Sequence, residues 1–531
     1  MTPIFEIEQI LSRLSICKFS ELFQLADGLM LTGSYASNTK NENSDIDIIV
    51  LSKNINYVYS ETTYSSSECI QFIFLPYFKF QNIILDDKYR GEGMYASMIR
   101  NGIIWKDSAS LILTKTKKYI LNTFEERRSD QLDYALVHQI ISTLDIIRDS
   151  DSSTEKIFCA SELLLNVTRL ILGKYTDDAK HLARLMPNKD ITVTILDSFR
   201  QLIETNNPSR FIHEIEGIIS FYGRHQHNYT TGWVFTYPYN NHIIVFSPSQ
   251  SGYNIHYQKY LIEMKAIFSD CLIYGFYEGR NQIMEEGYYI YIYSDKTSIE
   301  AILTKLNNYK RRIIKEAIEY GIIYSFPYKS LFHEGLAFGG KVLFNRLVQF
   351  YSELWGKYLA LSMINPVESR KNISNILATD YFLKLSHTSN LLQCSFLEFM
   401  SHIYDILILE AVDPNGLYNI TQIDLMRKET LKGYIKNYYI SKIAYENLVN
   451  DIEDNRLSEL EDLNQTFNML FEFIRNIKEN EILMPDIYPV RNKKDMLIVN
   501  ISIHIMSILQ LAPHDKFSIV FNYLQYKNYD I

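Results

Sequence analysis

Apolar and polar residues alternate in short segments through the first 125 residues of the chain. Residues 3–15 (PIFEIEQILSRLS) have the apolar spacing of a helix, whereas residues 28–34 (GLMLTGS) predict a short strand that ends in a turn. Residues 45–52 (DIDIIVLS) alternate as a half-buried strand does. These elements predict an N-terminal α/β domain over residues 1–125.

Two further strands belong to this first segment. Residues 68–80 (ECIQFIFLPYFKF) predict a strand that stops or kinks at Pro76, because proline cannot donate to a sheet ladder. Residues 94–107 (MYASMIRNGIIWKD) predict a helix, a turn at Gly102 and another strand.

The periodicity changes twice along the rest of the chain. Residues 126–225 repeat the helical pattern between Asp/Ser/Thr clusters, which predicts a helical bundle. Residues 226–330 give the order β, α, β, β, α, β of a ferredoxin-like domain. Residues 331–531 are helical again. The expected fold class is therefore α+β, with four domains.

Composition narrows the range of partners. Apolar residues make up 47% and charged residues 22%, as in a globular protein, and the net charge of −9 disfavours broad binding to nucleic acid. The five cysteines are scattered singly, which fits a reducing compartment. The N-terminus lacks the pattern of a signal peptide, and the apolar segment 496–512 is interrupted by Asn500 and His504. We expect a cytoplasmic protein without a membrane span.

Two carboxylates stand at the start of the apolar strand 45–52. Gly33 and Ser34 are followed by ten residues and then by Asp45-Ile46-Asp47. If these residues lie on a strand, Asp45 and Asp47 point to one face. The two negative charges repel each other unless they bind a hard cation. Mg²⁺ is such a cation, and its ligands are commonly one or two carboxylates, water and phosphate oxygens. A glycine-serine turn nearby allows a phosphate to approach the backbone.

The stretch GSYASNTKNENSDID, preceded by the apolar strand LMLT, resembles the signature of the DNA polymerase β-type nucleotidyltransferases, in particular their minimal group. The resemblance covers about the first 110 residues. It implies that Gly33 and Ser34 hold the triphosphate of ATP or another NTP, and that Asp45 and Asp47 bind Mg²⁺. In similar enzymes a basic residue of the helical domain contacts the triphosphate, a role that Lys180 can fill, although a solvated helix face explains it too.

The sequence departs from that family at the third carboxylate. Active members carry a further acid on the neighbouring strand, which is expected to be 68–76 here. Alternation places Gln71 at that position, and glutamine is not a base. Glu68 can substitute if the strand begins with a bulge, and more remote candidates are Glu61 and the pair Asp86-Asp87.

The resemblance favours a Mg²⁺-dependent enzyme that transfers an NMP unit, AMP from ATP, to a hydroxyl of a small-molecule or protein acceptor. Catalysis is assigned to Asp45, Asp47 and Glu68. Two alternatives stay open at this point. One is an RNA terminal nucleotidyltransferase, which the acidic charge disfavours. The other is a nucleotide-binding or scaffold protein of weak activity, which Gln71 would explain.

Overall fold

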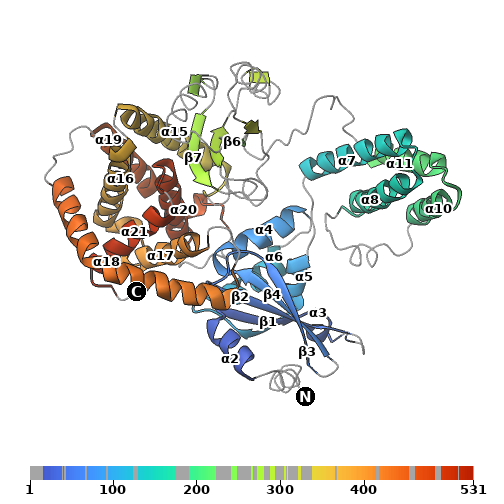
Figure 1. Cartoon of the computed structure of the whole chain (residues 1–531), viewed down its shortest axis with the longest axis horizontal. Helices are drawn as coiled ribbons and strands as arrows, with labels where there is room; N and C mark the ends of the chain where they lie inside the picture. Colours follow the sequence, from blue (N-terminus) through green and yellow to red (C-terminus); the bar gives the residue numbers. More distant parts are fainter. Residues whose placement is uncertain are drawn as a thin grey trace. The chain divides into compact units, whose positions relative to one another are not determined.

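A computed structural model gives the architecture of the chain (Figure 1). The residues that it describes are 16–38, 40, 44–65, 68–90, 94–123, 130–173, 190–222, 241–247, 265–266, 269, 272–279, 287–293, 304–305, 308, 321–323, 338–364, 367–413, 418–453, 461–484, 492–511 and 513–529. The helix expected over 3–15 lies outside these residues.

A five-stranded sheet forms the N-terminal α/β region, in the order β3-β4-β2-β1-β5. Its strands are β1 (Gly28–Thr32), β2 (Ile46–Ser52), β3 (Tyr59–Ser65), β4 (Glu68–Pro76) and β5 (Ile103–Lys106). β2 and β4 are parallel and the other neighbours are antiparallel. The predicted strands are confirmed, and β4 ends at Pro76 as expected. β3 was not predicted, because its sequence YSETTYS has few apolar residues.

Short helices connect these strands and follow them. They are α2 (Ile16–Leu25), α3 (Gly33–Ala36), η1 (Tyr77–Lys79), α4 (Phe80–Arg90), α5 (Met94–Asn101) and α6 (Ile112–Thr123). The turn expected at Gly102 separates α5 from β5.

One face of the sheet packs into an apolar core, as the alternation in β2 predicts. Ile46, Ile48 and Val50 of β2 are buried there with Ile70 and Phe74 of β4. A residue from the distant C-terminal half, Ile420, belongs to the same cluster and is 4% exposed.

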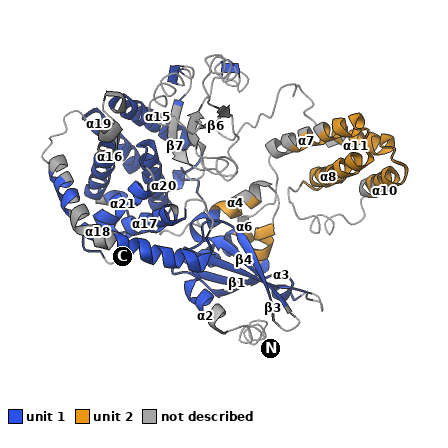
Figure 2. Cartoon of the chain, in the orientation of Figure 1, with its two compact units in different colours: residues 1–81, 101–119, 237–531 blue, residues 82–100, 120–236 orange. Residues whose placement is uncertain are grey.

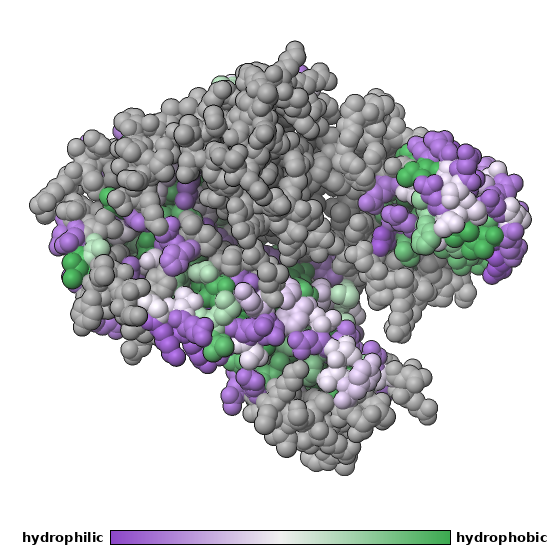
Figure 3. Space-filling model, viewed as in Figure 1, coloured by the Kyte–Doolittle hydropathy of each residue, from purple (hydrophilic) through white to green (hydrophobic). Residues whose placement is uncertain are grey.

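The chain divides into two compact units (Figure 2). Unit 1 comprises residues 1–81, 101–119 and 237–531, and unit 2 comprises residues 82–100 and 120–236. Much of unit 2 is a set of helices, namely α7 (Asp130–Asp149), α8 (Ser153–Leu172), α10 (Asp190–Thr205) and α11 (Ser209–Tyr222). The surface of these helices mixes polar and apolar residues (Figure 3), and Phe158 of α8 is 74% exposed.

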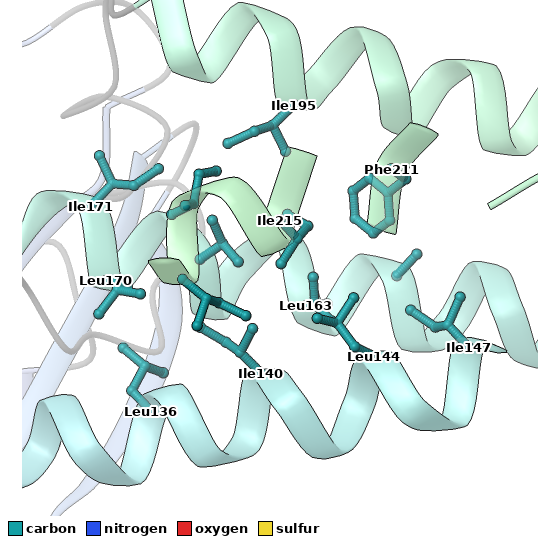
Figure 4. Close-up of a cluster of buried hydrophobic side chains, with 14 of the residues drawn as sticks. Leu136, Ile140, Leu144, Ile147, Leu163, Leu170, Ile171, Ile195, Phe211 and Ile215 are labelled. Atoms are coloured by element: carbon teal, nitrogen blue, oxygen red, sulfur yellow. The ribbon is translucent and has the colours of Figure 1, made fainter. Parts of the chain in front are cut away.

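Buried aliphatic residues from all four helices hold this unit together (Figure 4). Leu144 of α7, Leu163 of α8, Ile195 of α10 and Phe211 of α11 are all buried in one cluster. The helical periodicity of the sequence predicts these inward positions, since residues three or four apart share a helix face.

A second sheet, in unit 1, has the order β7-β8-β6-β9. The strands are β6 (Asn241–Ser247), β7 (Leu272–Gly279), β8 (Gly287–Tyr293) and β9 (Gly321–Ile323). The three pairings in this sheet are antiparallel. β6, the first of these strands along the chain, lies between β8 and β9. This is the strand order that a split βαβ arrangement requires. The two helices expected between the strands lie largely outside the described residues.

The C-terminal region is helical, as expected. Its elements are α15 (Lys341–Ile364), α16 (Val367–His387), η2 (Ser389–Leu391), α17 (Phe396–Val412), α18 (Ile420–Glu453), α19 (Glu461–Asn476), η4 (Glu479–Glu481), α20 (Lys493–Ile508) and α21 (Pro513–Tyr526). The apolar segment 496–512 falls mostly in α20, a largely buried helix. No helix in the described part of the chain is both long and apolar enough to cross a bilayer.

Polar contacts join the end of β2 to the C-terminal helices α17 and α18. Lys53 Nζ donates to Asp405 Oδ2 over 3.0 Å, and Arg427 lies 3.5 Å from Oδ1 of the same carboxylate. The Arg427 guanidinium also donates to Asn54 Oδ1. Burial lowers the pKa of Lys53, but Asp405, Asp27 and Tyr77 together outweigh burial and raise the pKa above its ordinary value. The strand that carries Asp47 is thus fixed at its far end by a charged network.

His402 of α17 lies beside this network. Its ring meets Phe78 edge to face at 5.7 Å, and its Nε2 atom is buried with no hydrogen-bond partner among the described residues. Burial lowers the pKa of His402 to about 4 from 6.5, with the nearby Lys53 acting in the same direction and Asp405 opposing it. The imidazole is therefore neutral in the folded protein at neutral pH.

Acid is expected to destabilise unit 1 through His402. The unfolded chain binds a proton on this side chain at pH 6.5 and the folded chain only near pH 4, so stability falls as the pH drops between these values. The loss should be on the order of 3 kcal/mol, since one pKa unit corresponds to about 1.4 kcal/mol and burial lowers the pKa from 6.5 to about 4. Urea unfolding across this pH range measures it. His402→Phe keeps the ring contact, and a pH dependence as steep in this variant as in the parent protein would refute the assignment.

Candidate active site

A row of polar residues crosses four strands at one end of the five-stranded sheet. Thr32 of β1 pairs with Asp47 of β2, Asp47 pairs with Gln71 of β4, and Gln71 pairs with Thr62 of β3. Directly paired residues share a face of the sheet. Thr32 is buried, Asp47 and Gln71 are half-buried and Thr62 is exposed, so the row leads from the interior to solvent.

The contact between Gly33 and Asp47 defines the site. Gly33 has a φ of +68°, and a Cβ atom built on it would lie 2.0 Å from Oδ2 and 3.0 Å from Cγ of Asp47. A side chain at position 33 is therefore excluded twice, by backbone conformation and by the carboxylate. The predicted glycine-serine turn and the second aspartate lie side by side.

The turn itself is held by its own hydrogen bonds. The Ser37 hydroxyl donates to the Gly33 carbonyl over 3.0 Å, and the Ser37 amide donates to the same oxygen over 3.2 Å. Ser34, the second residue of α3, is half-buried. The backbone around Ser34 is thus fixed next to Asp47.

Asp45 differs from Asp47 in its surroundings. β2 begins at Ile46, so Asp45 lies just before the strand. The alternation that was expected to include both aspartates therefore holds only from Ile46 onward. Asp45 is exposed, whereas Asp47 is half-buried against the turn. The two carboxylates are separated by a single residue and flank the first residue of the strand.

Gln71 occupies the position next to Asp47, as the sequence predicts. The pairing of β4 with β2 and with β3 has no register shift, so the strand carries no bulge that would alter which residue stands beside Asp47. Glu68 is the first residue of β4, and its backbone pairs with Ser65.

The other predicted residues fall in several places. Lys180 lies outside the described residues. Glu61 is exposed and pairs with Phe72, which places it on the sheet face opposite Gln71. Asp87 caps α5, because its carboxylate accepts from the Met94 and Ala96 amides at 3.1 and 2.7 Å.

The β4 face that carries Gln71 is open to solvent only at one end of the strand, because Ile73 on the same face is buried. Ile73 is 8% exposed, and Ile49 beside it in β2 is fully buried. Both faces of the sheet are thus covered along β2, and the polar end with Asp47 and Gln71 is where β2 and β4 approach solvent. Alternation identified the faces but could not show what covers them.

Thr62 was missed by the sequence reasoning, although its strand has a usable signal. Ser60, Thr62 and Tyr64 alternate in YSETTYS, and all three are exposed. Tyrosine and threonine favour strands, so the residue composition of this segment is the signal that predicts β3. This signal places a fourth strand at the site, beside the three that the sequence predicts.

Carboxylate oxygens are suitable ligands for Mg²⁺, and Asp45 with Asp47 supplies two carboxylates. The described residues contain no group of three or more His, Cys, Asp or Glu side chains arranged to hold a metal ion. The donor set fits an ion that completes its coordination with phosphate oxygens and water.

Gly33→Ala is expected to destabilise unit 1 and to push the Asp47 carboxylate away from the turn. The left-handed backbone costs about 1–2 kcal/mol for a non-glycine residue, and the overlap with Asp47 adds about 1–3 kcal/mol. Urea unfolding measures both. Gly173→Ala, measured on the unfolding of unit 2, is the control for the backbone cost alone, because Gly173 has a φ of +65° but nothing within 4 Å of a built Cβ. Equal losses in the two variants would contradict the close contact.

One comparison with known families identifies the segment that carries this site. A sequence model of the nucleotidyltransferase domain matches residues 16–88, from α2 to α4. A nucleotidyltransferase-like protein from Exiguobacterium sibiricum matches with 11% identity and a TM-score of 0.27, covering 54% of this chain and 98% of its own. No curated protein matches the sequence. The residues that form the turn, β2 and the start of β4 all fall within the matched segment, and residues 16–88 therefore form a nucleotidyltransferase domain.

Proposed function

We propose that this protein is a Mg²⁺-dependent nucleotidyltransferase that transfers an NMP unit, AMP from ATP, to a hydroxyl acceptor on a small molecule or a protein. The observation that carries the proposal is the close approach of the Asp47 carboxylate to Gly33, which brings the turn that would bind phosphate next to a carboxylate that would bind the metal ion. The scattered cysteines favour a cytoplasmic setting.

Gly33 and Ser34 would bind the triphosphate. The absence of a side chain at Gly33 lets phosphate oxygens approach the backbone, and the Ser34 hydroxyl adds a donor. Lys180 would contribute a further positive charge to the triphosphate, as the family resemblance implies.

Asp45 and Asp47 would hold the metal ion. A bound Mg²⁺ neutralises charge on the triphosphate and polarises the phosphorus for attack. The half-buried position of Asp47 fixes one ligand against the turn, while the exposed Asp45 is accessible from solvent.

The protein's own contribution to the reaction would be positioning. An acceptor oxygen must lie in line with the bond that breaks, and correct placement supplies a large part of the rate. Gln71 stands where a carboxylate would accept the acceptor proton, and an amide cannot do so. We therefore expect turnover to depend on an acceptor that gives up its proton readily.

Gln71 also supports a second candidate function, a nucleotide-binding protein of weak catalytic activity. It would bind ATP with one metal ion at the same two aspartates. A nucleic-acid acceptor is less favoured, because the chain carries a net charge of −9.

Asp47→Asn should abolish Mg²⁺-dependent ATP binding, and Asp45→Asn should weaken it. Each change removes a charge that would face the ion, and loss of one metal ligand commonly costs more than tenfold in affinity. Titration calorimetry with ATP, with and without Mg²⁺, measures the effect, and pyrophosphate release measures turnover. Glu61→Gln is the control, since Glu61 is an exposed acid on the opposite sheet face. Unchanged binding in Asp47→Asn would rule out the proposed site.

Gln71→Asp should raise pyrophosphate release if the missing base limits the reaction. The new carboxylate would stand beside Asp47, where it can accept a proton or bind a second ion. General-base catalysis is commonly worth at least about a hundredfold, which sets the scale of the gain. Glu68→Gln decides whether Glu68 already serves this role. A large loss of turnover in Glu68→Gln, with no gain in Gln71→Asp, would show that the site is complete without position 71.

A further inference from the structure

The edge strand β3 presents hydroxyl groups on the face that carries Asp47 and Gln71. Thr62 pairs with Gln71, and Tyr64 pairs with Cys69, one pleat along the same face. Tyr64 is 75% exposed, and Thr62 and Ser60 are exposed as well. β4, which carries Cys69 and Gln71, lies between β3 and the strand that carries Asp47.

The direction of attack points to this strand. The glycine-serine turn follows β1, so the β- and γ-phosphates of a bound nucleotide would lie on the β1 side of Asp47. An in-line displacement requires the attacking oxygen opposite the departing pyrophosphate. The sheet order β3-β4-β2-β1 places β4 and then β3 on that opposite side.

Tyr64 is close enough to Gln71 along the sheet for its ring to extend toward the site. Neighbouring strands are about 4.8 Å apart. Residues diagonal to each other across a strand pair, as Tyr64 and Gln71 are, lie about 7–8 Å apart, within reach of an aromatic side chain. The phenol can therefore extend over β4 without any change in the register of the strands.

The chemistry of the acceptor follows from Gln71. An aliphatic hydroxyl attacks poorly unless a base removes its proton, whereas a phenol is far more acidic and needs less help. A site with an amide in place of the third carboxylate suits a phenolic acceptor. Tyr64 is a phenol on the correct face, and water can take its proton because the side chain is exposed.

We propose that Tyr64 is an acceptor for the NMP unit held by its own chain, so that the protein modifies itself. This rests on the proposed function. The Tyr64 Oη attacks the α-phosphorus and forms a new O–P bond. The bond from that phosphorus to the oxygen bridging it to the β-phosphorus breaks, and pyrophosphate leaves. The phenolic proton passes to solvent, and no oxidant or reductant is needed.

The test uses the full chain with Mg²⁺ and ATP radiolabelled in the α-phosphate, followed by intact mass measurement and peptide mapping. The expected result is one AMP unit on Tyr64. Labelling of the Tyr64→Phe variant should fall to background. The variant should fold as the parent protein does, since the change removes only the hydroxyl of an exposed side chain. Tyr418→Phe, which changes another exposed tyrosine, should label as the parent protein does.

A mixing experiment tests whether the transfer stays within one chain. Parent protein is incubated with affinity-tagged Asp47→Asn protein that keeps Tyr64, and labelling of the tagged chain would overturn the proposal. Labelling at another residue, or none while the protein transfers AMP to an added acceptor, would also overturn it and leave the proposed function intact. If Asp47→Asn binds Mg²⁺ and ATP as tightly as the parent protein, the proposed function itself fails.

Discussion

The close approach of the Asp47 carboxylate to the backbone of Gly33 is the constraint on which the site depends. It requires a glycine in a left-handed conformation directly after β1 and an aspartate on the paired position of β2. The antiparallel pairing of β1 with β2 brings Thr32 opposite Asp47. The turn that directly follows Thr32 therefore lies next to the Asp47 carboxylate. This contact places the backbone proposed to bind phosphate next to the carboxylate proposed to bind the metal ion.

Local patterns along the chain predicted the positions of most strands at the site. The alternation in DIDIIVLS located β2 and its buried face, and Pro76 marked the end of β4. The order of strands and helices predicted the antiparallel arrangement of β6 to β9 before any pairing was known. These features are encoded by neighbours along the chain, where period, turn residues and proline have direct physical meaning.

The features that sequence alone did not provide depend on distant residues. The place of Ile420 in the N-terminal core cannot be read from residues near it, and neither can the cover over Ile73. The polar strand β3 lacks the apolar signal that identifies most strands, although it borders the site. The position of Gln71 was predicted because alternation along residues 68–76 and the family resemblance together place it where a third carboxylate is expected, and the pairing of β4 with β2 puts it beside Asp47.

Ile420 contributes to the N-terminal core, so the core of the N-terminal domain is not formed by that domain alone. The nucleotidyltransferase domain spans residues 16–88 in sequence, yet part of its interior comes from the first residue of α18. Directly after β2, Lys53 forms an ion pair with Asp405 of α17, and Asn54 accepts a hydrogen bond from Arg427 of α18. A gene fragment that encoded the domain alone would leave an apolar hole and an uncompensated lysine in its product. Residues 16–88 are therefore expected to be less stable without α17 and α18, and an exchange of this segment between proteins would have to keep matching residues at positions 405, 420 and 427.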